Sequence, residues 1–299
     1  MTHAIHLRGV SKSYGNHTAL DNLSFSVPRG SICGIIGANG AGKTTLYSII
    51  GGYLPFDGGE IDILGDGPFD IKRHQGRVAL LPQDSELHLD TPIHDILLYL
   101  ARLQGMSKTR ALQETDRVLQ AVDLHERRTA HIDQLSHGMR RRVCVAQALL
   151  GNPELILLDE PTAGLDPHQT ARLREVFFKK PKDSTLLISS HILSELEEVC
   201  DYVVFMKKGR CTEHGSLSKL TGKTSVVRIA YRGDLPLKEL QDQFDDVQLS
   251  IKDEHLILRG LQGQSVAEMN RKILPVLLKE DIDLLEVHRG FRLFDKIKR

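Results

Sequence analysis

The segment Gly37-Ala38-Asn39-Gly40-Ala41-Gly42-Lys43-Thr44 fits the pattern G-x-x-x-x-G-K-S/T. The run Ile32 to Ile36 before it predicts a buried strand, and Thr45 to Ile50 after it contains no helix breaker. A glycine-rich turn between a strand and a helix lets successive backbone N–H groups surround a phosphate, and the helix N-terminus adds favourable partial charge. A loop that binds nothing is the alternative, but two Gly, Lys and Thr in register favour binding of a nucleoside triphosphate.

The pattern gives each of its residues a role. The side chain of Lys43 is expected to reach the β- and γ-phosphates, and the Thr44 hydroxyl is expected to ligate Mg²⁺. We assign the remaining phosphate contacts of this loop to Gly37, Asn39, Gly40, Gly42 and Thr45.

Two further apolar runs end in residues that suit phosphate chemistry. Leu155 to Leu158 ends in Asp159 and Glu160. An aspartate at the tip of a buried strand can hold Mg²⁺, and the next glutamate would reach an attacking water. An acidic, solvated turn is the alternative for this pair when it is taken alone.

The run from Thr185 to Ser190 ends at His191. A lone histidine at a strand end is usually structural. In a parallel sheet, however, strand ends share one edge, so we expect His191 near the phosphate loop and Asp159, within reach of a γ-phosphate.

A helix is predicted from Ser136 to Leu150, with Ser136 as its N-cap. With Gly138 nearby, its N-terminus is a second place suited to a phosphate. If it lies on a separate subdomain it cannot serve the phosphate loop of its own chain, which implies a partner. The arginines from Arg140 to Arg142 are expected on a solvated helix face rather than in a nucleic-acid patch.

These motifs resemble those of the nucleotide-binding subunit of ATP-binding cassette (ABC) transporters. That family carries the signature LSGGQ, and this chain has Leu-Ser-His-Gly-Met over residues 135–139. The serine and second glycine are retained, while His137 and Met139 depart from the pattern and leave the detail of their contact open. The LSxGM form looks like that of the exporter branch.

The resemblance implies an α/β fold, a P-loop NTPase ABC cassette with a helical subdomain, that hydrolyses ATP with Mg²⁺. It implies that Ser136 and Gly138 meet the triphosphate held by the opposite subunit. The other roles that it implies are adenine stacking by Tyr14, sensing of Mg²⁺ and γ-phosphate by Gln83, a loop crossing to the partner at Asp166, and a catalytic switch at His191.

Composition bears on partners. The formal net charge is zero, so nothing favours nucleic acid as a binding partner. The four cysteines form no C-x-x-C pair, which is typical of reduced thiols in cytosolic proteins. No apolar run approaches the roughly 20 residues of a spanning helix, so we expect a soluble chain. By resemblance, its partners are a membrane-spanning permease and a second copy of the ATPase, at the cytoplasmic face of the inner or plasma membrane.

The chain is expected to contain two domains. Residues 1–220 are assigned to the ABC ATPase domain, with the helical subdomain at about 88–150 and helices over Ile93 to Gln104 and Lys108 to Val122. Residues 221–299 begin with a linker at residues 221–224 and then show the order β-α-β-β-α-β, a small α+β, ferredoxin-like accessory domain. This includes a hairpin turn at residues 252–254 and a terminal helix from Phe291.

Three functions are compatible with these features. The first is the ATPase of an exporter with a separate ABC-2 type membrane subunit. The alternative is an importer ATPase whose C-terminal domain senses solute, which the ferredoxin-like tail favours and the signature disfavours. A non-transport ABC ATPase fits less well, because one cassette is present without a coiled-coil insertion or a basic tail.

Overall fold

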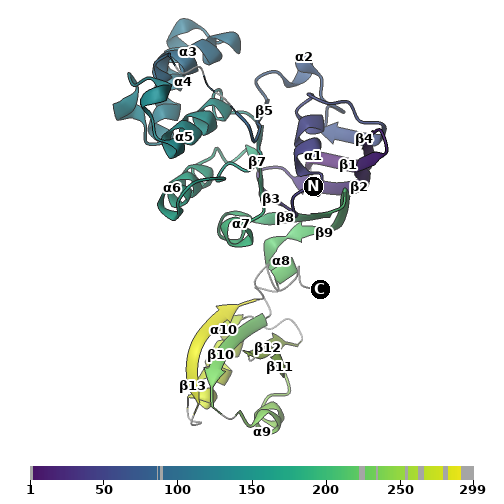
Figure 1. Cartoon of the computed structure of the whole chain (residues 1–299). Helices are drawn as coiled ribbons and strands as arrows, with labels where there is room; N and C mark the ends of the chain where they lie inside the picture. Colours follow the sequence, from purple (N-terminus) through teal and green to yellow (C-terminus); the bar gives the residue numbers. More distant parts are fainter. Residues whose placement is uncertain are drawn as a thin grey trace. The chain divides into compact units, whose positions relative to one another are not determined.

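The computed structural model divides into two compact units, Met1–His214 and Gly215–Arg299 (Figure 1). We had expected the division between residues 220 and 221; the short helix α8 (Leu217–Thr221) falls with the second unit. Residues 222–224 of the linker, most of the turn at 252–254 and the terminal helix from Phe291 lie outside the described residues. The structure describes residues 3–85, 87, 90–221, 226–233, 235–252, 255–261, 266–278 and 282–290.

A six-stranded sheet forms the centre of the first unit, in the order β5-β6-β7-β3-β8-β9. Its pairs β5–β6, β6–β7, β7–β3 and β3–β8 are parallel. Three of its strands are buried at every residue, as expected when helices cover both faces of a parallel sheet. The strands are β3 (Ile32–Ile36), β5 (Val78–Leu81), β6 (Leu155–Leu158), β7 (Thr185–Ser190), β8 (Tyr202–Lys207) and β9 (Arg210–Ser216).

A second, antiparallel sheet has the order β2-β1-β4 and packs with helix α1 into the same apolar core. Its strands are β1 (His3–Tyr14), β2 (His17–Pro28) and β4 (Gly58–Ile63). The other helices that accompany the strands are α1 (Lys43–Ile50), α2 (Ile71–His74), α6 (Pro167–Phe178) and α7 (Leu193–Val199).

The helical subdomain lies between β5 and β6 in the chain, and its three helices gather together (Figure 1). Its predicted helices are present: the first two end one residue earlier than expected, and the third, expected to reach Leu150, ends at Ala148. Its elements are α3 (Ile93–Leu103), α4 (Lys108–Ala121), the 3-10 turns η1 (His125–Arg127) and η2 (Ile132–Gln134), and α5 (His137–Ala148).

The second unit has the predicted β-α-β-β-α-β order and forms one antiparallel sheet, β11-β12-β10-β13. Helices α9 and α10 pack with this sheet around an apolar core. The elements are β10 (Val226–Arg232), α9 (Leu237–Asp242), β11 (Val247–Lys252), β12 (His255–Gly260), α10 (Val266–Leu277) and β13 (Asp283–Arg289).

Candidate functional site

The predicted phosphate loop joins β3 to α1, and its glycines are required by its shape. Gly40 and Gly42 have φ angles of 77° and 99°, in the left-handed region that favours glycine. A Cβ atom on Gly42 would lie 2.5 Å from the carbonyl oxygen of Ala19, and one on Gly37 would lie 2.7 Å from that of Met206. Glycine at these positions therefore avoids these clashes and leaves the loop backbone uncovered by side chains around the N-terminus of α1.

Three predicted side chains from separate segments meet beside this loop. Lys43 is 5% exposed, and its Nζ donates to the carbonyl oxygen of Gly37 at 2.9 Å. The same Nζ lies 3.5 Å from Oε1 of Glu160, and Nδ1 of His191 lies 3.3 Å from the other carboxylate oxygen, Oε2. The glutamate carboxylate is thus held between a buried cation and an imidazole.

Asp159 is buried at the end of β6, and one buried hydroxyl fixes it together with its neighbour. Oγ of Ser189 donates to Oδ1 of Asp159 at 2.5 Å and accepts from the backbone N–H of Glu160 at 2.7 Å. Oδ2 of Asp159 has no hydrogen-bond partner among the described residues. A buried carboxylate oxygen without a partner is a hard ligand, and the exposed Thr44 at the start of α1 offers a second oxygen. These residues fit Mg²⁺.

Glu160 itself has an unusual backbone conformation. Its φ angle is 47°, in the left-handed region that costs non-glycine residues free energy. Such residues persist where the surrounding structure holds them in place, and they concentrate at functional sites.

Tyr14 and Gln83 lie exposed at the ends of strands. Tyr14 ends β1 and is 46% exposed, with Nζ of Lys12 located 5.8 Å from the centre of its ring. This leaves an aromatic face available for stacking on a base. Gln83 follows β5 by two residues, and its side chain faces solvent.

The other predicted contacts form a second cluster at the N-termini of α5 and α6. Ser136 caps α5 by accepting from the N–H of Met139 at 3.3 Å, and Asp166 caps α6 by accepting from the N–H of Gln169 at 2.8 Å. A Cβ atom on Gly138 would lie 2.4 Å from the Gln169 side chain. In the part of the chain that the structure describes, no hydrogen bond or ion pair joins this cluster to the phosphate loop.

Comparison with known proteins decides the family. A family model described as "ABC transporter" matches residues 20–163. The ABC transporter ATP-binding protein YhaQ of Bacillus subtilis is 31% identical over 269 residues, which cover 85% of this chain and 89% of YhaQ. The chain belongs to the ABC transporter ATP-binding proteins.

Other matches give further similar proteins and the fold of this ABC ATPase. The Nod factor export ATP-binding protein I of Burkholderia orbicola is 36% identical over 217 residues, covering 71% of this chain and 70% of that protein. Among solved structures, CbiO1 of Clostridium perfringens, part of an ABC transporter complex, matches with a TM-score of 0.67 and 24% identity over 74% of this chain and 92% of its own. A dimeric cassette bound to ADP and Pi matches with a TM-score of 0.64 and 23% identity, covering 71% and 98%.

One expectation from the sequence of this ABC ATPase is wrong. The arginines from Arg140 to Arg142 were expected on a solvated helix face. Arg141 and Arg142 are each only 8% exposed. Arg142 donates to the carbonyl oxygens of Val122 at 2.7 Å and Asp123 at 3.1 Å, inside the helical subdomain. The expectation was wrong because α5 is buried on most of its sides, so consecutive arginines cannot all reach solvent.

Arg141 points the other way, toward the residues around Asp159 and Glu160. Its guanidinium donates to four main-chain carbonyl oxygens, and burial lowers its pKa, although a guanidinium stays charged at any physiological pH. The acceptors are the carbonyl oxygens of Gln83 at 3.0 Å, Asp159 at 3.0 Å, Glu160 at 2.8 Å and Pro161 at 3.1 Å. The sequence analysis missed both this arginine and Ser189.

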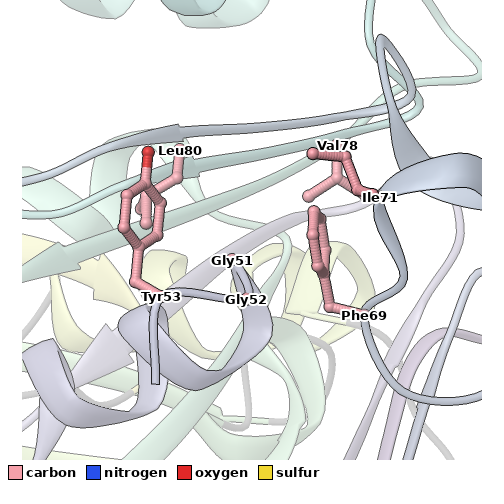
Figure 2. A pocket seen from close by; sticks show the side chains of 7 residues that line it. All are labelled: Gly51, Gly52, Tyr53, Phe69, Ile71, Val78 and Leu80. Carbon is pink, nitrogen blue, oxygen red and sulfur yellow. The ribbon is translucent and has the colours of Figure 1, made fainter. Parts of the chain in front are cut away.

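An apolar surface pocket of about 340 Å³ lies beside β5 of the cassette. Figure 2 shows Tyr53 and Leu80 on one side of it and Phe69, Ile71 and Val78 on the other. Tyr53 and Ile71 are 72% and 68% exposed. Gly51 and Gly52 lie between the two groups, and a Cβ atom on Gly52 would clash with the Phe69 ring. The sequence analysis did not predict this pocket.

Across the described part of the ABC ATPase, no helix is both long and apolar enough to cross a membrane.

Proposed function

We propose that this chain is the ATPase of an exporter, that it acts as a homodimer, and that a separate ABC-2 type membrane subunit forms the translocation path. The observation that carries the catalytic part is the Glu160 carboxylate held between Lys43 and His191. The similarity to Nod factor export proteins supports the exporter direction.

In this proposal each group acts on ATP at a defined place. Lys43 and the open backbone of the phosphate loop bind the β- and γ-phosphates, and Tyr14 stacks on adenine. Asp159 and Thr44, with Gln83, would hold Mg²⁺, which neutralises phosphate charge when bound. Glu160 orients a water molecule and accepts its proton as the water oxygen attacks the γ-phosphorus, the bond to the β–γ bridging oxygen breaks, and ADP and phosphate leave.

His191 completes the site on the side of the γ-phosphate. Nδ1 of His191 lies near Oε2 of Glu160. The ring therefore couples the position of that carboxylate to the group that the other ring nitrogen contacts. The Glu160 carboxylate and the γ-phosphate both accept hydrogen bonds, so donating to both at once requires a proton on each ring nitrogen.

The second cluster supports a dimer. Ser136 and Asp166 are exposed at the N-termini of two twelve-residue helices, where backbone N–H groups favour an anion. We propose that the cluster binds the triphosphate on the opposite chain, so that two chains close around two ATP molecules. The dimeric cassette with ADP and Pi is consistent with such an arrangement.

The apolar pocket beside β5 supports a membrane partner. Val78 and Leu80 belong to β5, which leads directly to Gln83, so an occupant of this pocket would touch the segment that enters the catalytic cluster. Exposed Tyr53 and Ile71 suit the apolar side of a helix. We propose that a cytoplasmic helix of the permease packs here, which places this chain on the cytoplasmic face of the membrane.

Mixed dimers test the shared site. One dimer carries Lys43→Ala on one chain and Ser136→Arg on the other; the matched control carries both changes on the same chain, paired with wild type. If the signature acts across the dimer, the first dimer keeps one intact site and binds one ATP, while the control has two damaged sites. The reverse pattern would show that the signature serves its own chain.

A further inference from the structure

Arg141 joins three parts of the cassette through one guanidinium. It lies on α5, two residues after the first turn capped by Ser136, and its donors reach the carbonyl oxygen of Gln83 and those of residues 159–161. The signature helix, the Gln83 segment and the end of β6 therefore share one rigid connection. A guanidinium suits this task because its donors are fixed in a planar fork.

The bonds of Arg141 fall where the backbone is strained. Glu160 has its φ angle at 47°, and its carbonyl oxygen accepts from Nη2 of Arg141 at 2.8 Å. Its N–H is bound by Oγ of Ser189, so both polar groups of its backbone are held by buried side chains. The carbonyl groups on either side, of Asp159 and Pro161, are held by Arg141 as well.

Stability alone is a poor explanation for this arginine. The hydrogen bonds that Arg141 makes to described residues all go to neutral carbonyl oxygens, while the carboxylates of Asp159, Asp84 and Glu160 act on its charge from farther away, and burial still lowers its pKa. Burying a charge costs free energy, and replacing buried ionic groups with apolar ones is often neutral or stabilising. The bonds do, however, fix the one residue whose carboxylate lies between Lys43 and His191.

We propose that Arg141 is a positioning residue for ATP hydrolysis: it holds Glu160 in its left-handed conformation and keeps that residue aligned with Gln83. This rests on the proposed role of Glu160. The hydrogen bonds of Arg141 go to main-chain carbonyl oxygens, so its loss is expected to change the alignment of the carboxylate and to leave the phosphate loop, Lys43 and Tyr14 in place. Its replacement is expected to lower kcat and to leave ATP affinity unchanged.

The test compares Arg141→Lys with Arg142→Lys in the full chain. The two arginines are adjacent, equally buried, and both donate to carbonyl oxygens, but Arg142 bonds only within the helical subdomain. Lysine keeps the positive charge but lacks the planar guanidinium with its fixed donors. We expect Arg141→Lys to lower kcat roughly 10- to 100-fold, the scale of a misplaced catalytic group, with the Kd for ATP within about twofold of wild type. Arg142→Lys is expected to keep kcat per folded molecule, even though its Tm falls.

Two controls make the outcome decisive. Glu160→Gln is assayed in parallel: if it stays active, the proposed role of Glu160 fails, whereas an inactive Glu160→Gln beside a fully active Arg141→Lys overturns only this inference. Equal losses of kcat in both lysine variants, following their Tm, also overturn it. If Arg141→Lys does not fold, Arg141→Gln, which keeps an amide donor at this position, takes its place and must show the same loss of kcat at unchanged ATP affinity; wild-type kcat would refute the proposal.

Discussion

The cassette and the C-terminal domain bury different kinds of side chain. The cassette buries charged side chains, and four of them, Lys43, Arg141, Asp159 and Glu160, gather close to the end of β6, while Lys12 and Arg142 are buried elsewhere. Beyond Thr221, no charged or polar side chain that the structure describes is buried, and the core is formed by apolar residues from the sheet and both helices.

This difference indicates where each domain does its work. Buried charges cost free energy and concentrate where chemistry requires them, so the cassette carries the reaction in its interior. The C-terminal domain has a core built for packing alone. Whatever it contributes must come from its surface, through a partner or a ligand that binds there. The predictions below test this division.

The largest effect is expected from Glu160→Gln. The amide keeps the shape but cannot accept the proton of the attacking water, so kcat should fall about 10²- to 10⁴-fold, the usual contribution of a general base. ATP binding should persist, and the variant should accumulate as a nucleotide-closed dimer. Steady-state hydrolysis and size-exclusion chromatography with ATP check both points. Glu126→Gln, at a carboxylate 99% exposed, is the control; hydrolysis within about twofold of wild type for Glu160→Gln would contradict the mechanism.

Lys43→Ala should come next. It removes the buried cation beside the phosphate loop and leaves the Glu160 carboxylate without its ion pair. We expect ATP affinity to fall at least about tenfold, the scale of one lost charge-assisted contact, together with hydrolysis. Lys72→Ala, at an exposed lysine of the same domain, is the control. Unchanged affinity and turnover would mean that the loop does not bind phosphate as proposed.

A core substitution in the C-terminal domain should leave catalysis unaffected. Ile273 is fully buried in α10, and Ile273→Ala should destabilise this domain by about 2 to 5 kcal/mol through the cavity it leaves. Hydrogen exchange of the domain measures that loss, while the Kd for ATP is measured in parallel. Arg271→Ala, at an exposed position of the same helix, is the control. A weaker ATP affinity in Ile273→Ala alone would show that the two domains are coupled.

Much of the fold and of the phosphate-binding loop could be predicted from the sequence, because both depend on local sequence patterns. Apolar runs gave the strands, and the glycine spacing gave the phosphate loop. What the sequence analysis missed depends on packing: Arg141 was placed in solvent, although it shares a helix face with Gly138, Val145 and Ala148, all buried. Helical spacing from Arg141 could have indicated its burial. Nothing local to Ser189 could have shown that its hydroxyl bonds both acidic residues, since β6 and β7 meet only in the fold.

The smallest effect on ATP binding is expected from removing the C-terminal domain. Every residue assigned to ATP lies before Cys200, so a chain of residues 1–221 should bind ATP with wild-type affinity. Cutting after residue 214 instead removes the end of β9 and α8, and comparing the two truncations locates the boundary between the domains. Loss of ATP binding by both would refute the assignment of all ATP contacts to the cassette.

The same truncations distinguish transport directions. If the C-terminal domain senses an imported solute, calorimetry of the full chain against amino acids should detect a ligand with a Kd of about 1 μM, near −8 kcal/mol. That ligand should lower ATPase activity in the full chain and have no effect on residues 1–221. In the exporter proposal no such ligand is found, and the loss on truncation appears only in activity stimulated by the membrane subunit. Because the core of the domain is formed by apolar residues in the part described, we expect its role to lie in such a surface contact, and an inhibitory solute would refute this directly.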